Sequence, residues 1–587
     1  MLKILKNLRS REWLLILLSI LFIVVQVQLD LRLPDYMSEI TRLVQTPGSE
    51  MNDVLLNGGK MLLCTLGSVA SSVVVGYFSA NVAARLSRRL RYRLFSKVTD
   101  FSYEEINYFS VPSLITRSTN DITQVQSMIA MGLQVVVRAP LIASIAVTKI
   151  LSKSWQWTAV TGGAIVFLII VITLLVTLAM PRFKKVQTLT DNLNMVTREN
   201  LTGLRVVRAY NAEDFQEKKF KKSNDALTRN YLFATRIMAV MQPSMTIVMS
   251  GIPLAIYWVG AHIINSAGMT EKISLFSEMV VFSSYAIQTV MAFMMLAMIL
   301  VIFPRASVSA NRINEVLDTR PRIISGKRQE GQSGIEGEIE FRNVSFKYPD
   351  AEEYVLENIS FKVNKGETVA FIGSTGSGKS TLINLVPRFY DVSEGEVLVD
   401  GINIKEYDLK SLYNKIGYVP QRSVIFSGTI ESNINFGENG KAPMTFDDIK
   451  NAARIAQAEE FIEGTENKYD SDVSQGGTNL SGGQKQRLAI ARAVARKPEI
   501  YIFDDTFSAL DYKTDKVLRQ TLRDETKHVT SLIVAQRIGT IKDADKIVVL
   551  DDGKIVGMGK HSELLKTCEV YGEIAQSQLS KEELENA

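Results

Sequence analysis

The most chemically specific segment of the chain is GSTGSGKST, residues 373–381, which matches the pattern G-x-x-x-x-G-K-[ST]. Its small residues allow successive backbone N–H groups to curl around phosphate oxygens, and the start of a following helix adds positive potential. Lys379 would reach the terminal phosphates, and the Ser380 hydroxyl would bind Mg²⁺. A β-branched run precedes the motif and the helical run TLINLV follows it. The segment predicts a nucleoside triphosphate site and leaves the class of enzyme open.

Two further motifs narrow the class. LSGGQ occupies residues 480–484, and the acidic pair Asp504 and Asp505 follows the apolar run 500–503. With the phosphate loop in this order, the chain resembles the ATP-binding cassette (ABC) transporters. It resembles most closely the bacterial half-exporters, in which six membrane spans are fused ahead of one cassette. NDITQVQ and GLRVVRAYNAE also look like the intracellular loops of that family, so the resemblance covers nearly the whole chain.

The resemblance implies a role for each matching residue. Tyr348 would stack on adenine, Gln421 would touch Mg²⁺ and the attacking water, and Asp504 would hold the magnesium shell. The LSGGQ motif, which is the signature of the family, would cap the γ-phosphate of ATP on the opposite cassette. Gln475 replaces the glutamate usual before the signature, which puts that family contact in doubt. The implied nucleotide-binding residues are Tyr348, Gly373, Ser374, Thr375, Gly376, Ser377, Gly378, Lys379, Ser380, Thr381, Gln421 and Asp504. The implied residues of the site across the dimer are Leu480, Ser481, Gly482, Gly483 and Gln484, with Ser508, Ala509, Leu510 and Asp511 along the interface.

Two positions depart from the family pattern. Asp505 stands in place of the glutamate that acts as general base, and Gln536 stands in place of a histidine. Aspartate is one methylene shorter, so its oxygens would fall short of the water by roughly 1 Å, and such misplacement costs about a hundredfold. Glutamine cannot carry a charge. Together the changes predict hydrolysis reduced by about 10²–10⁴ with ATP binding retained.

The combination of two substituted catalytic positions with an intact LSGGQ motif bears on whether this chain pairs with a second copy of itself or with a different chain. A homodimer would contain two impaired sites, whereas a related but non-identical half could supply the missing glutamate and histidine. We therefore expect a heterodimer in which this chain contributes its intact signature to the partner's competent site. The alternative is an ordinary homodimer that tolerates aspartate.

The elements that must carry these motifs follow from composition. The chain has 587 residues and a net charge of +5. Apolar stretches of about 20 residues recur six times in the first half. Basic residues after spans two and four and at the N-terminus, with an acidic loop after span one, predict both termini in the cytoplasm. The predicted spans are 13–31, 61–80, 133–150, 157–180, 237–263 and 275–303.

The predicted fold is therefore a membrane all-α domain followed by an α/β P-loop ABC nucleotide-binding domain. The boundaries are 1–320 for the transmembrane domain, 321–337 for a linker and 338–587 for the cassette. The connections between spans two and three and between four and five are about 50 residues long and read as helical. We expect them to extend into the cytoplasm and to place short turns near 111–114 and 202–208 against the cassettes.

Two features of the spans concern the substrate. Arg138 lies inside span three, where a cation normally faces a cavity or a partner helix, although snorkelling to an interface is the alternative. Methionines at helical spacing in spans five and six could form a deformable apolar wall or could be ordinary helix packing. The candidate cavity residues are Arg138, Met241, Met245, Met291, Met294 and Met298.

The function expected is ATP-driven export of amphipathic small molecules, of the multidrug type, across a bacterial cytoplasmic membrane. Lipids, porphyrins or peptides are alternative substrates, and an ATP-gated channel or regulatory subunit is an alternative class. ATP and Mg²⁺ are the expected cofactors. A basic stripe for nucleic acid is lacking, and Cys64, Cys568 and three scattered histidines support no metal cluster.

Overall fold

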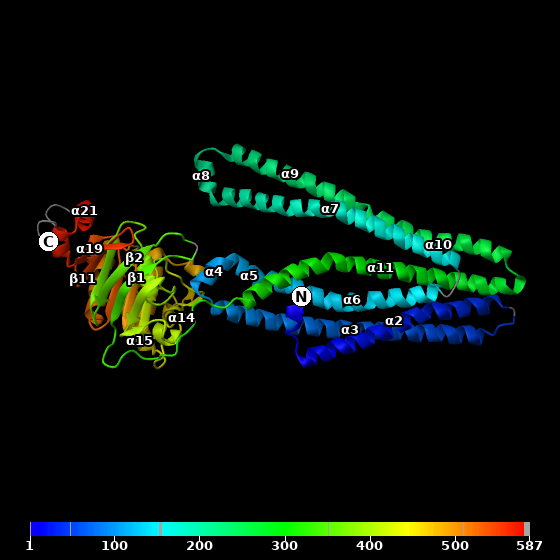
Figure 1. The fold of residues 1–587 in the computed structure, drawn as a ribbon, viewed down its shortest axis with the longest axis horizontal. Helices are drawn as coiled ribbons and strands as arrows, with labels where there is room; N and C mark the ends of the chain where they lie inside the picture. Colours follow the sequence, from blue (N-terminus) through cyan, green and yellow to red (C-terminus); the bar gives the residue numbers. More distant parts are fainter. Residues whose placement is uncertain (1, 47, 152–154, 350, 509, 580–587) are drawn as a thin grey trace. The chain divides into compact units, whose positions relative to one another are not determined.

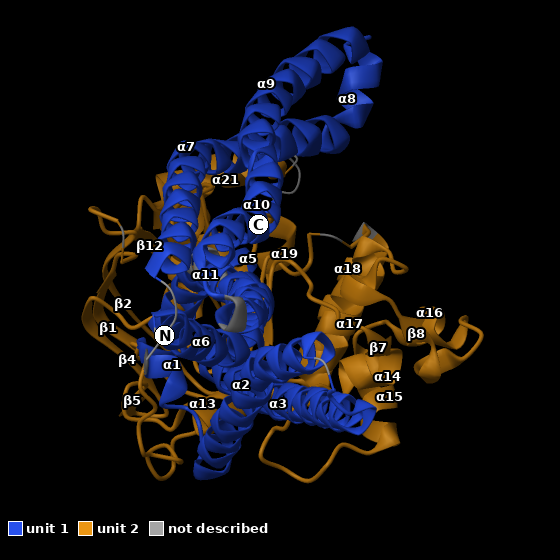
Figure 2. Cartoon of the chain, turned by 90° about the vertical axis from the view of Figure 1, so that its right-hand side faces the viewer, with its two compact units in different colours: residues 1–99, 112–319 blue, residues 100–111, 320–587 orange. Residues whose placement is uncertain are grey.

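The computed structural model describes residues 2–46, 48–151, 155–349, 351–508 and 510–579. The chain divides into two compact units, coloured separately in Figure 2. The first contains Met1–Thr99 and Pro112–Thr319, and the second contains Asp100–Val111 and Arg320–Ala587. The short segment Asp100–Val111 therefore belongs with the second unit, although both of its neighbours in the chain belong to the first.

The first unit is helical, and six of its described helical runs are long and apolar enough to cross a membrane, which confirms the predicted class. Helices α3 and α7 have 49 and 48 residues. At about 1.5 Å per residue they measure roughly 70 Å, more than twice the hydrocarbon thickness, so each continues well beyond the bilayer. The helices are α1 Leu2–Leu5, α2 Ser10–Gln45, α3 Met51–Thr99, α5 Val111–Thr116, a π-helix Arg117–Asp121, α6 Ile122–Leu151, α7 Trp155–Thr202, α8 Leu204–Ala209, α9 Glu213–Ala239, α10 Met241–Ser266 and α11 Met269–Asp318.

These helices form one unit, in which α10 packs against both α7 and α11. Helix α2 packs against α3, and α6 packs against α3 and α11. Helices α7, α8 and α9 form a hairpin, which Figure 1 shows as a long arm. The arm carries large apolar side chains in the open: Leu201, Val206, Tyr210 and Phe215 are 61–80% exposed.

The second unit is a cassette built on two main sheets. The larger has six strands in the order β12-β11-β3-β10-β9-β6, and only the β11–β12 pair is antiparallel. Its central strands are continuous apolar runs because helices cover both faces. The smaller sheet is antiparallel, in the order β2-β1-β4-β5. The strands are β1 Ile339–Phe346, β2 Leu356–Val363, β3 Thr368–Gly373, β4 Glu394–Val399, β5 Ile402–Asn403, β6 Ile416–Val419, β7 Gly428–Thr429, β8 Asp472–Val473, β9 Ile500–Asp504, β10 Thr530–Val534, β11 Lys546–Asp551 and β12 Lys554–Gly559.

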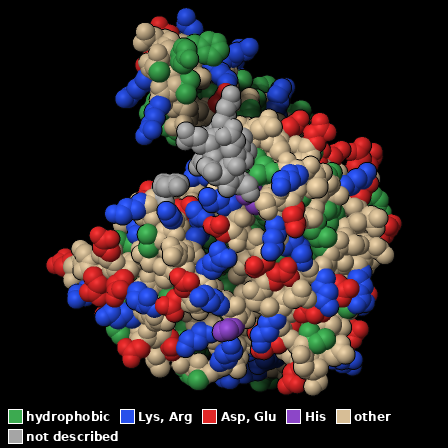
Figure 3. Space-filling model, turned by 90° about the vertical axis from the view of Figure 1, so that its left-hand side faces the viewer, with side chains coloured by type: hydrophobic (Ala, Val, Ile, Leu, Met, Phe, Trp, Pro, Cys, Tyr) green, Lys and Arg blue, Asp and Glu red, His purple; other side chains and the backbone are tan. Residues whose placement is uncertain are grey.

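Helices surround these sheets, and acidic and basic side chains are interspersed over the face drawn in Figure 3. Such a mixture is ordinary for a solvated surface. The helices are α4 Tyr103–Phe109, α12 Lys379–Leu385, α13 Leu409–Lys415, α14 Ile430–Ile434, α15 Phe446–Ile455, α16 Glu459–Glu463, α17 Gly482–Ala495, α18 Tyr512–Glu525, α19 Ile538–Ile541, α20 His561–Thr567 and α21 Glu569–Gln578, with 3-10 turns at Lys468–Asp470 and Gln475–Gly477.

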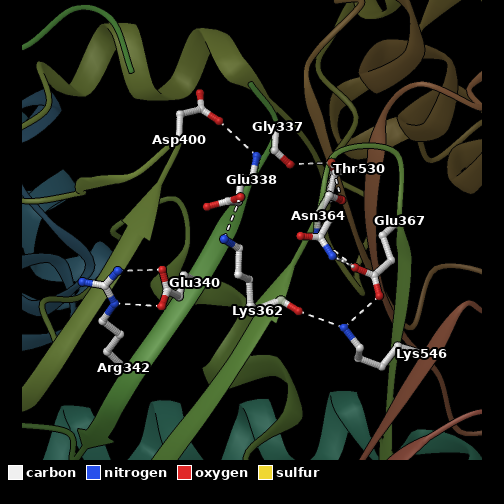
Figure 4. A network of polar contacts seen from close by, with 10 residues as sticks. All are labelled: Gly337, Glu338, Glu340, Arg342, Lys362, Asn364, Glu367, Asp400, Thr530 and Lys546. Carbon is white, nitrogen blue, oxygen red and sulfur yellow. Dashed lines mark hydrogen bonds and ion pairs between the residues drawn. The ribbon is translucent and has the colours of Figure 1, made fainter. Parts of the chain in front are cut away.

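A polar network joins the two sheets (Figure 4). The buried hydroxyl of Thr530, at the start of β10, donates to the carbonyl of Gly337 at 2.5 Å and accepts from the amide of Gly366 at 3.1 Å. Nearby, Lys546 on β11 donates to the carbonyl of Lys362 on β2 at 2.9 Å. The residues just before β1 and near the end of β2 are therefore bonded to the starts of β10 and β11, two interior strands of the large sheet.

The segment expected to be a linker lies on the cassette. The amide of Gly326 donates to the carbonyl of Tyr407 at 2.8 Å, and that of Lys327 donates to the carbonyl of Glu406 at 2.9 Å. Tyr407 is fully buried. This part of the chain is held by backbone hydrogen bonds, so it is part of the second compact unit.

The connection between the second and third predicted spans also differs in detail from expectation. The helix that belongs to the cassette unit is α4, whereas residues 111–114 begin the next helix, α5. The local cause is a capping box: the Ser102 hydroxyl accepts from the amide of Glu104, and the Ser102 amide donates to the carboxylate of Glu105. Ser110, with φ of 63°, ends the helix. In the second connection, α8 occupies the region where the turn was expected.

Candidate functional site

The phosphate loop joins β3 to α12 as the motif requires. Gly376 and Gly378 both have φ of 91°, a conformation that disfavours residues with a Cβ. A Cβ on Gly378 would also lie 2.7 Å from Leu356 Cδ2. The ammonium of Lys379 donates to the carbonyls of Gly373 at 2.9 Å and Ser374 at 2.6 Å. Burial lowers the pKa of Lys379, while Asp505 and Asp504 oppose that shift.

Two of the three residues expected to hold magnesium, Ser380 and Asp504, are in contact, whereas the third, Gln421, donates to Asp505. The Ser380 hydroxyl donates to the carboxylate of Asp504 at 2.7 Å. Burial raises the pKa of Asp504, with the charge of Asp505 adding to the shift and Ser380 opposing it. Hydroxyl and carboxylate oxygens suit Mg²⁺, which keeps several water and phosphate ligands. Among the described residues there is no group of three or more His, Cys, Asp and Glu that could hold a metal by itself. Nucleotide phosphates and water would complete the shell of a Mg²⁺ ion held by Ser380 and Asp504.

Asp505 follows β9 and is tied down by two amides. Gln536 Nε2 donates to Asp505 Oδ2 at 2.8 Å, and Gln421 Nε2 donates to the same oxygen at 3.3 Å. The Asp505 backbone has φ of 45°, which Asp tolerates better than most residues. Burial raises the pKa of Asp505, and the hydrogen bonds from Gln421, Ser508 and Gln536 oppose that shift. The two positions singled out in the sequence are thus in direct contact.

Tyr348, just after β1, lies beside the phosphate loop. Its hydroxyl is 3.0 Å from the hydroxyl of Thr381 on α12. Its ring stands perpendicular to those of Phe346 and Tyr390, with centroids 5.0 and 5.3 Å away. Tyr348 is half-buried, so part of its ring remains open to a ligand. This position fits the aromatic platform for a base.

The signature forms a separate element. Ser481 caps α17, because its hydroxyl accepts from the amide of Gln484 while its own amide donates to the Gln484 side chain at 2.8 Å. Leu480 packs against the adjoining hydrophobic core, and a Cβ on Gly482 would meet open space. None of the described hydrogen bonds joins the signature to the phosphate loop. An exposed helix start of this kind can receive an anion from outside the chain.

Comparison with known proteins identifies this arrangement. Residues 16–302 match the family described as ABC transporter transmembrane region, and residues 356–508 match the ABC transporter family. The chain belongs to the ABC transporters. It is a half-transporter of the exporter type, with six spanning helices fused to one ATPase cassette, and hence a multi-pass membrane protein.

Relatives of this transporter span nearly its whole length. It is 38% identical to an uncharacterized ABC transporter ATP-binding protein of Mycobacterium tuberculosis over 89% of this chain and 87% of the relative. It is 33% identical to an ATP-dependent lipid A-core flippase of Pseudomonas aeruginosa over 84% and 80%. The structure of a bacterial Atm1-family ABC exporter with ATP bound has the same fold, at a TM-score of 0.79 and 23% identity over 96% of this chain and 98% of the other.

The segment after Asp505 starts the next helix of the transporter. Asp511 caps α18 by accepting from the amide of Thr514 at 2.9 Å, and Leu510 is buried. Ser508 is exposed, and its hydroxyl donates to the carbonyl of Asp505 at 2.9 Å. Ala509 lies outside the described residues. The interface role of this segment stays a prediction.

Arg138 has a partner that the sequence did not indicate. Its guanidinium lies 3.0 Å from the carboxylate of Asp30 on α2, which also accepts from the Ser68 hydroxyl on α3 at 2.5 Å. The pair links three helices within the membrane unit. Asp30 lies near the end of the predicted first span, 13–31, and α2 continues beyond it to Gln45. The carboxylate of Asp30 within a predicted span was the feature of the sequence that could have indicated a partner for Arg138.

The methionines divide by environment. Met294 on α11 packs against the hydrophobic core of the membrane unit and lines a cavity of about 320 Å³, whereas Met291 is 42% exposed. Met241 and Met245 on α10 are half-buried, and the side chain of Met298 lies outside the described part of the chain. Leu168 and Ile172 on α7 and Phe293 on α11 are among the other lining residues. Contact of any of these residues with substrate stays a prediction.

Proposed function

We propose that this chain is one half of a heterodimeric ABC exporter, and that its own nucleotide site holds ATP and cleaves it slowly. The observation that carries the proposal is the hydrogen bond from Gln536 to Asp505. A general base needs a free lone pair within hydrogen-bond reach of the attacking water. Here the carboxylate is short, and one of its oxygens already accepts from two amides.

Retention of ATP is supported by the rest of the site. Lys379, Ser380 and Asp504 converge behind the glycine loop, and Tyr348 stands beside it. These groups bind phosphate, Mg²⁺ and the base without taking part in proton removal. ATP is the expected nucleotide because it is the ligand of the family.

A non-identical partner is supported by the intact signature. Ser481 and Gln484 form a capped helix start that would complete a nucleotide site on the opposite cassette. The partner would supply a glutamate and a histidine at the positions of Asp505 and Gln536, so that the complex has one fast site and one slow site. The exposed apolar side chains of the α7–α9 arm favour a partner half packed against it.

The proposed substrates are amphipathic small molecules, and the proposed function is multidrug efflux. The membrane is a bacterial cytoplasmic membrane, with both termini of the chain in the cytoplasm. The apolar cavity between α7 and α11 suits the hydrocarbon part of such a molecule. A second candidate is a lipid, because the similar protein of Pseudomonas aeruginosa is named a lipid A-core flippase. Uptake assays in vesicles with a fluorescent dye and with a labelled lipid would separate the two candidates.

The decisive experiment measures ATP turnover by the purified full-length chain. In a homodimer the intact signature of each copy would complete the other's site, so restoring the base tests the proposal directly. We expect slow turnover in the natural chain and a rise of about a hundredfold in Asp505→Glu/Gln536→His. The same double substitution with Ser481→Ala is the matched control, and it should remove the gain. Brisk ATPase activity of the natural chain would overturn the proposal.

A further inference from the structure

The backbone around Gln536 is held by a side chain from a distant part of the cassette. Gln578, the last residue of α21, contacts this backbone through both atoms of its amide. Its Nε2 donates to the carbonyl of Gln536 at 2.8 Å, and its Oε1 accepts from the amide of Ile538 at 2.8 Å. One planar amide therefore spans the turn between β10 and α19.

This turn has no local side chain that could do the same. Ile538 is the first residue of α19, so its N–H has no partner within the helix. The residue before a helix often offers a side-chain oxygen to the first amides, but Arg537 has only donors and makes no cap hydrogen bond. Gln578 supplies from another segment the acceptor that the turn lacks.

Helix α21 is anchored firmly enough to position this amide. It packs against α19, β3 and β11 (Figure 1). Tyr571 and Ala575 on α21 are fully buried in the same hydrophobic cluster as Ile538. Gln578 itself is exposed, so its side chain can be replaced without opening the core. Its two hydrogen bonds can therefore be removed separately from the packing of the helix.

The other end of the same segment is held by a different helix. Arg519 on α18 donates to the carbonyl of Gly539 at 2.9 Å, and its guanidinium also bonds to Asp515 at 2.9 Å. Loss of the Gln578 amide should therefore free the start of the segment while α19 stays in place. The freed residue is Gln536, whose side chain reaches Asp505.

We propose that Gln578 is a positioning residue of the nucleotide site, which fixes the backbone from which the side chain at position 536 reaches position 505. The peptide groups on either side of a Cα set the direction of its side chain, and Gln578 bonds to this stretch of backbone twice. A displacement of about 1 Å near the reacting atoms costs about a hundredfold in rate. The inference rests on the proposed function only in that positions 505 and 536 take part in turnover.

Hydrogen exchange of the full-length protein tests the contact directly. Gln578→Met keeps the length of the side chain and removes both hydrogen bonds. With ATP and without magnesium, which prevents hydrolysis, exchange of residues 536–539 should become about fivefold faster while that of residues 373–381 is unchanged. Gln576→Met, at an exposed position of the same helix, is the matched control and should change neither segment. Equal exchange of residues 536–539 in the natural chain and in Gln578→Met would overturn the inference.

Kinetics separate positioning from a general effect on folding. In the Asp505→Glu/Gln536→His protein, Gln578→Met should lower kcat about tenfold and leave the KM for ATP within about twofold, because the phosphate loop is untouched. In Asp505→Glu/Gln536→Ala the same change should alter kcat by less than about twofold, since the side chain to be positioned is gone. An unchanged kcat in the first protein, or an equal fall in both, would overturn the inference. Should reversion bring no gain in turnover, the slow-site proposal fails, whereas the exchange comparison still decides this inference.

Discussion

The side chains of Gln536 and Asp505 are joined by a 2.8 Å hydrogen bond between Nε2 and Oδ2. The two departures from the family pattern are therefore one structural unit, although they are far apart in sequence and follow the neighbouring strands β9 and β10. An uncharged amide can hold the carboxylate in one position but cannot relay or store a proton. The effect on ATP turnover of changing one of these residues is therefore expected to depend on the identity of the other.

This coupling predicts that the two reversions are not additive. Asp505→Glu alone should raise turnover only about threefold, because Gln536 and Gln421 still hold the carboxylate, and Gln536→His alone should change it by less than about twofold. The double reversion should give about a hundredfold. Phosphate release at saturating ATP measures all four proteins. A double variant equal to the product of the single effects would contradict the coupling.

The buried carboxylate of Asp504 predicts a pH-dependent cost to the nucleotide-free protein. Burial raises its pKa above the ordinary value of 3.8, so the folded state binds a proton more tightly than the unfolded state. The contribution of Asp504 to the free energy of unfolding therefore becomes less favourable as pH rises from the ordinary pKa of this carboxyl to its raised pKa in the folded state. Asp504→Asn should raise the unfolding temperature at pH 7 by roughly 2 °C and should remove stabilisation by Mg²⁺ and ATP. Asp524→Asn, at an exposed ion pair, is the control. A lowered unfolding temperature for Asp504→Asn would be the contrary result.

The Arg138–Asp30 pair predicts a rescue in the membrane unit. Arg138→Leu leaves the Asp30 carboxylate without its charge partner and should lower the free energy of unfolding by about 3 kcal/mol. Adding Asp30→Asn should recover most of that loss, since the unpaired charge is removed. Thermal unfolding in detergent measures both. Arg42→Ala, which breaks an exposed pair with Glu39, should stay within about 0.5 kcal/mol. Failure of the second substitution to rescue would exclude a charge effect.

Substitution of Thr530 should show how much its hydrogen bonds, which help to join the two sheets of the cassette, contribute to the free energy of unfolding. Thr530→Val keeps the shape of the side chain but removes its hydrogen bonds to Gly337 and from Gly366, together with a longer one of 3.5 Å to the carbonyl of Asn364. We expect a loss of about 2 kcal/mol, because the two backbone groups lose this partner in a buried place. Denaturant unfolding of the full-length protein measures it. Thr567→Val, at an exposed helical position, should change stability little, and an equal loss there would show that the contact has no special importance.

The position of the phosphate loop between β3 and α12 was predictable from the sequence because its motif is local. A glycine loop between strand and helix can fold in few ways, so the places of Lys379 and Ser380 followed from spacing, whereas their roles stay predictions. The spans were predictable for a similar reason, since about 20 apolar residues suffice to identify each. The helical extensions beyond spans two and four were predicted as well, but the residues at which each helix ends were not, because hydropathy marks only the apolar part of a helix.

The missed residues depend on contacts between distant segments. The pairing of Arg138 with Asp30 needs the packing of α2 against α6, and the contact of Tyr103 with Tyr390 joins positions far apart in the chain. No periodicity in the sequence reports such pairs. The end of α4 at Ser110 was also missed, because a serine with positive φ is not the usual signal for a helix end.

The assignment of Asp100–Val111 to the cassette unit affects how that unit can be isolated. A fragment that begins at Arg320 would lack α4, and the rings of Phe389 and Tyr390 would lose their cover. Such a fragment should aggregate in solution because these rings are uncovered. Its affinity for nucleotide would be that of an incomplete cassette. Covalent attachment of residues 100–111 through a designed loop would be needed before an excised cassette could represent the enzyme.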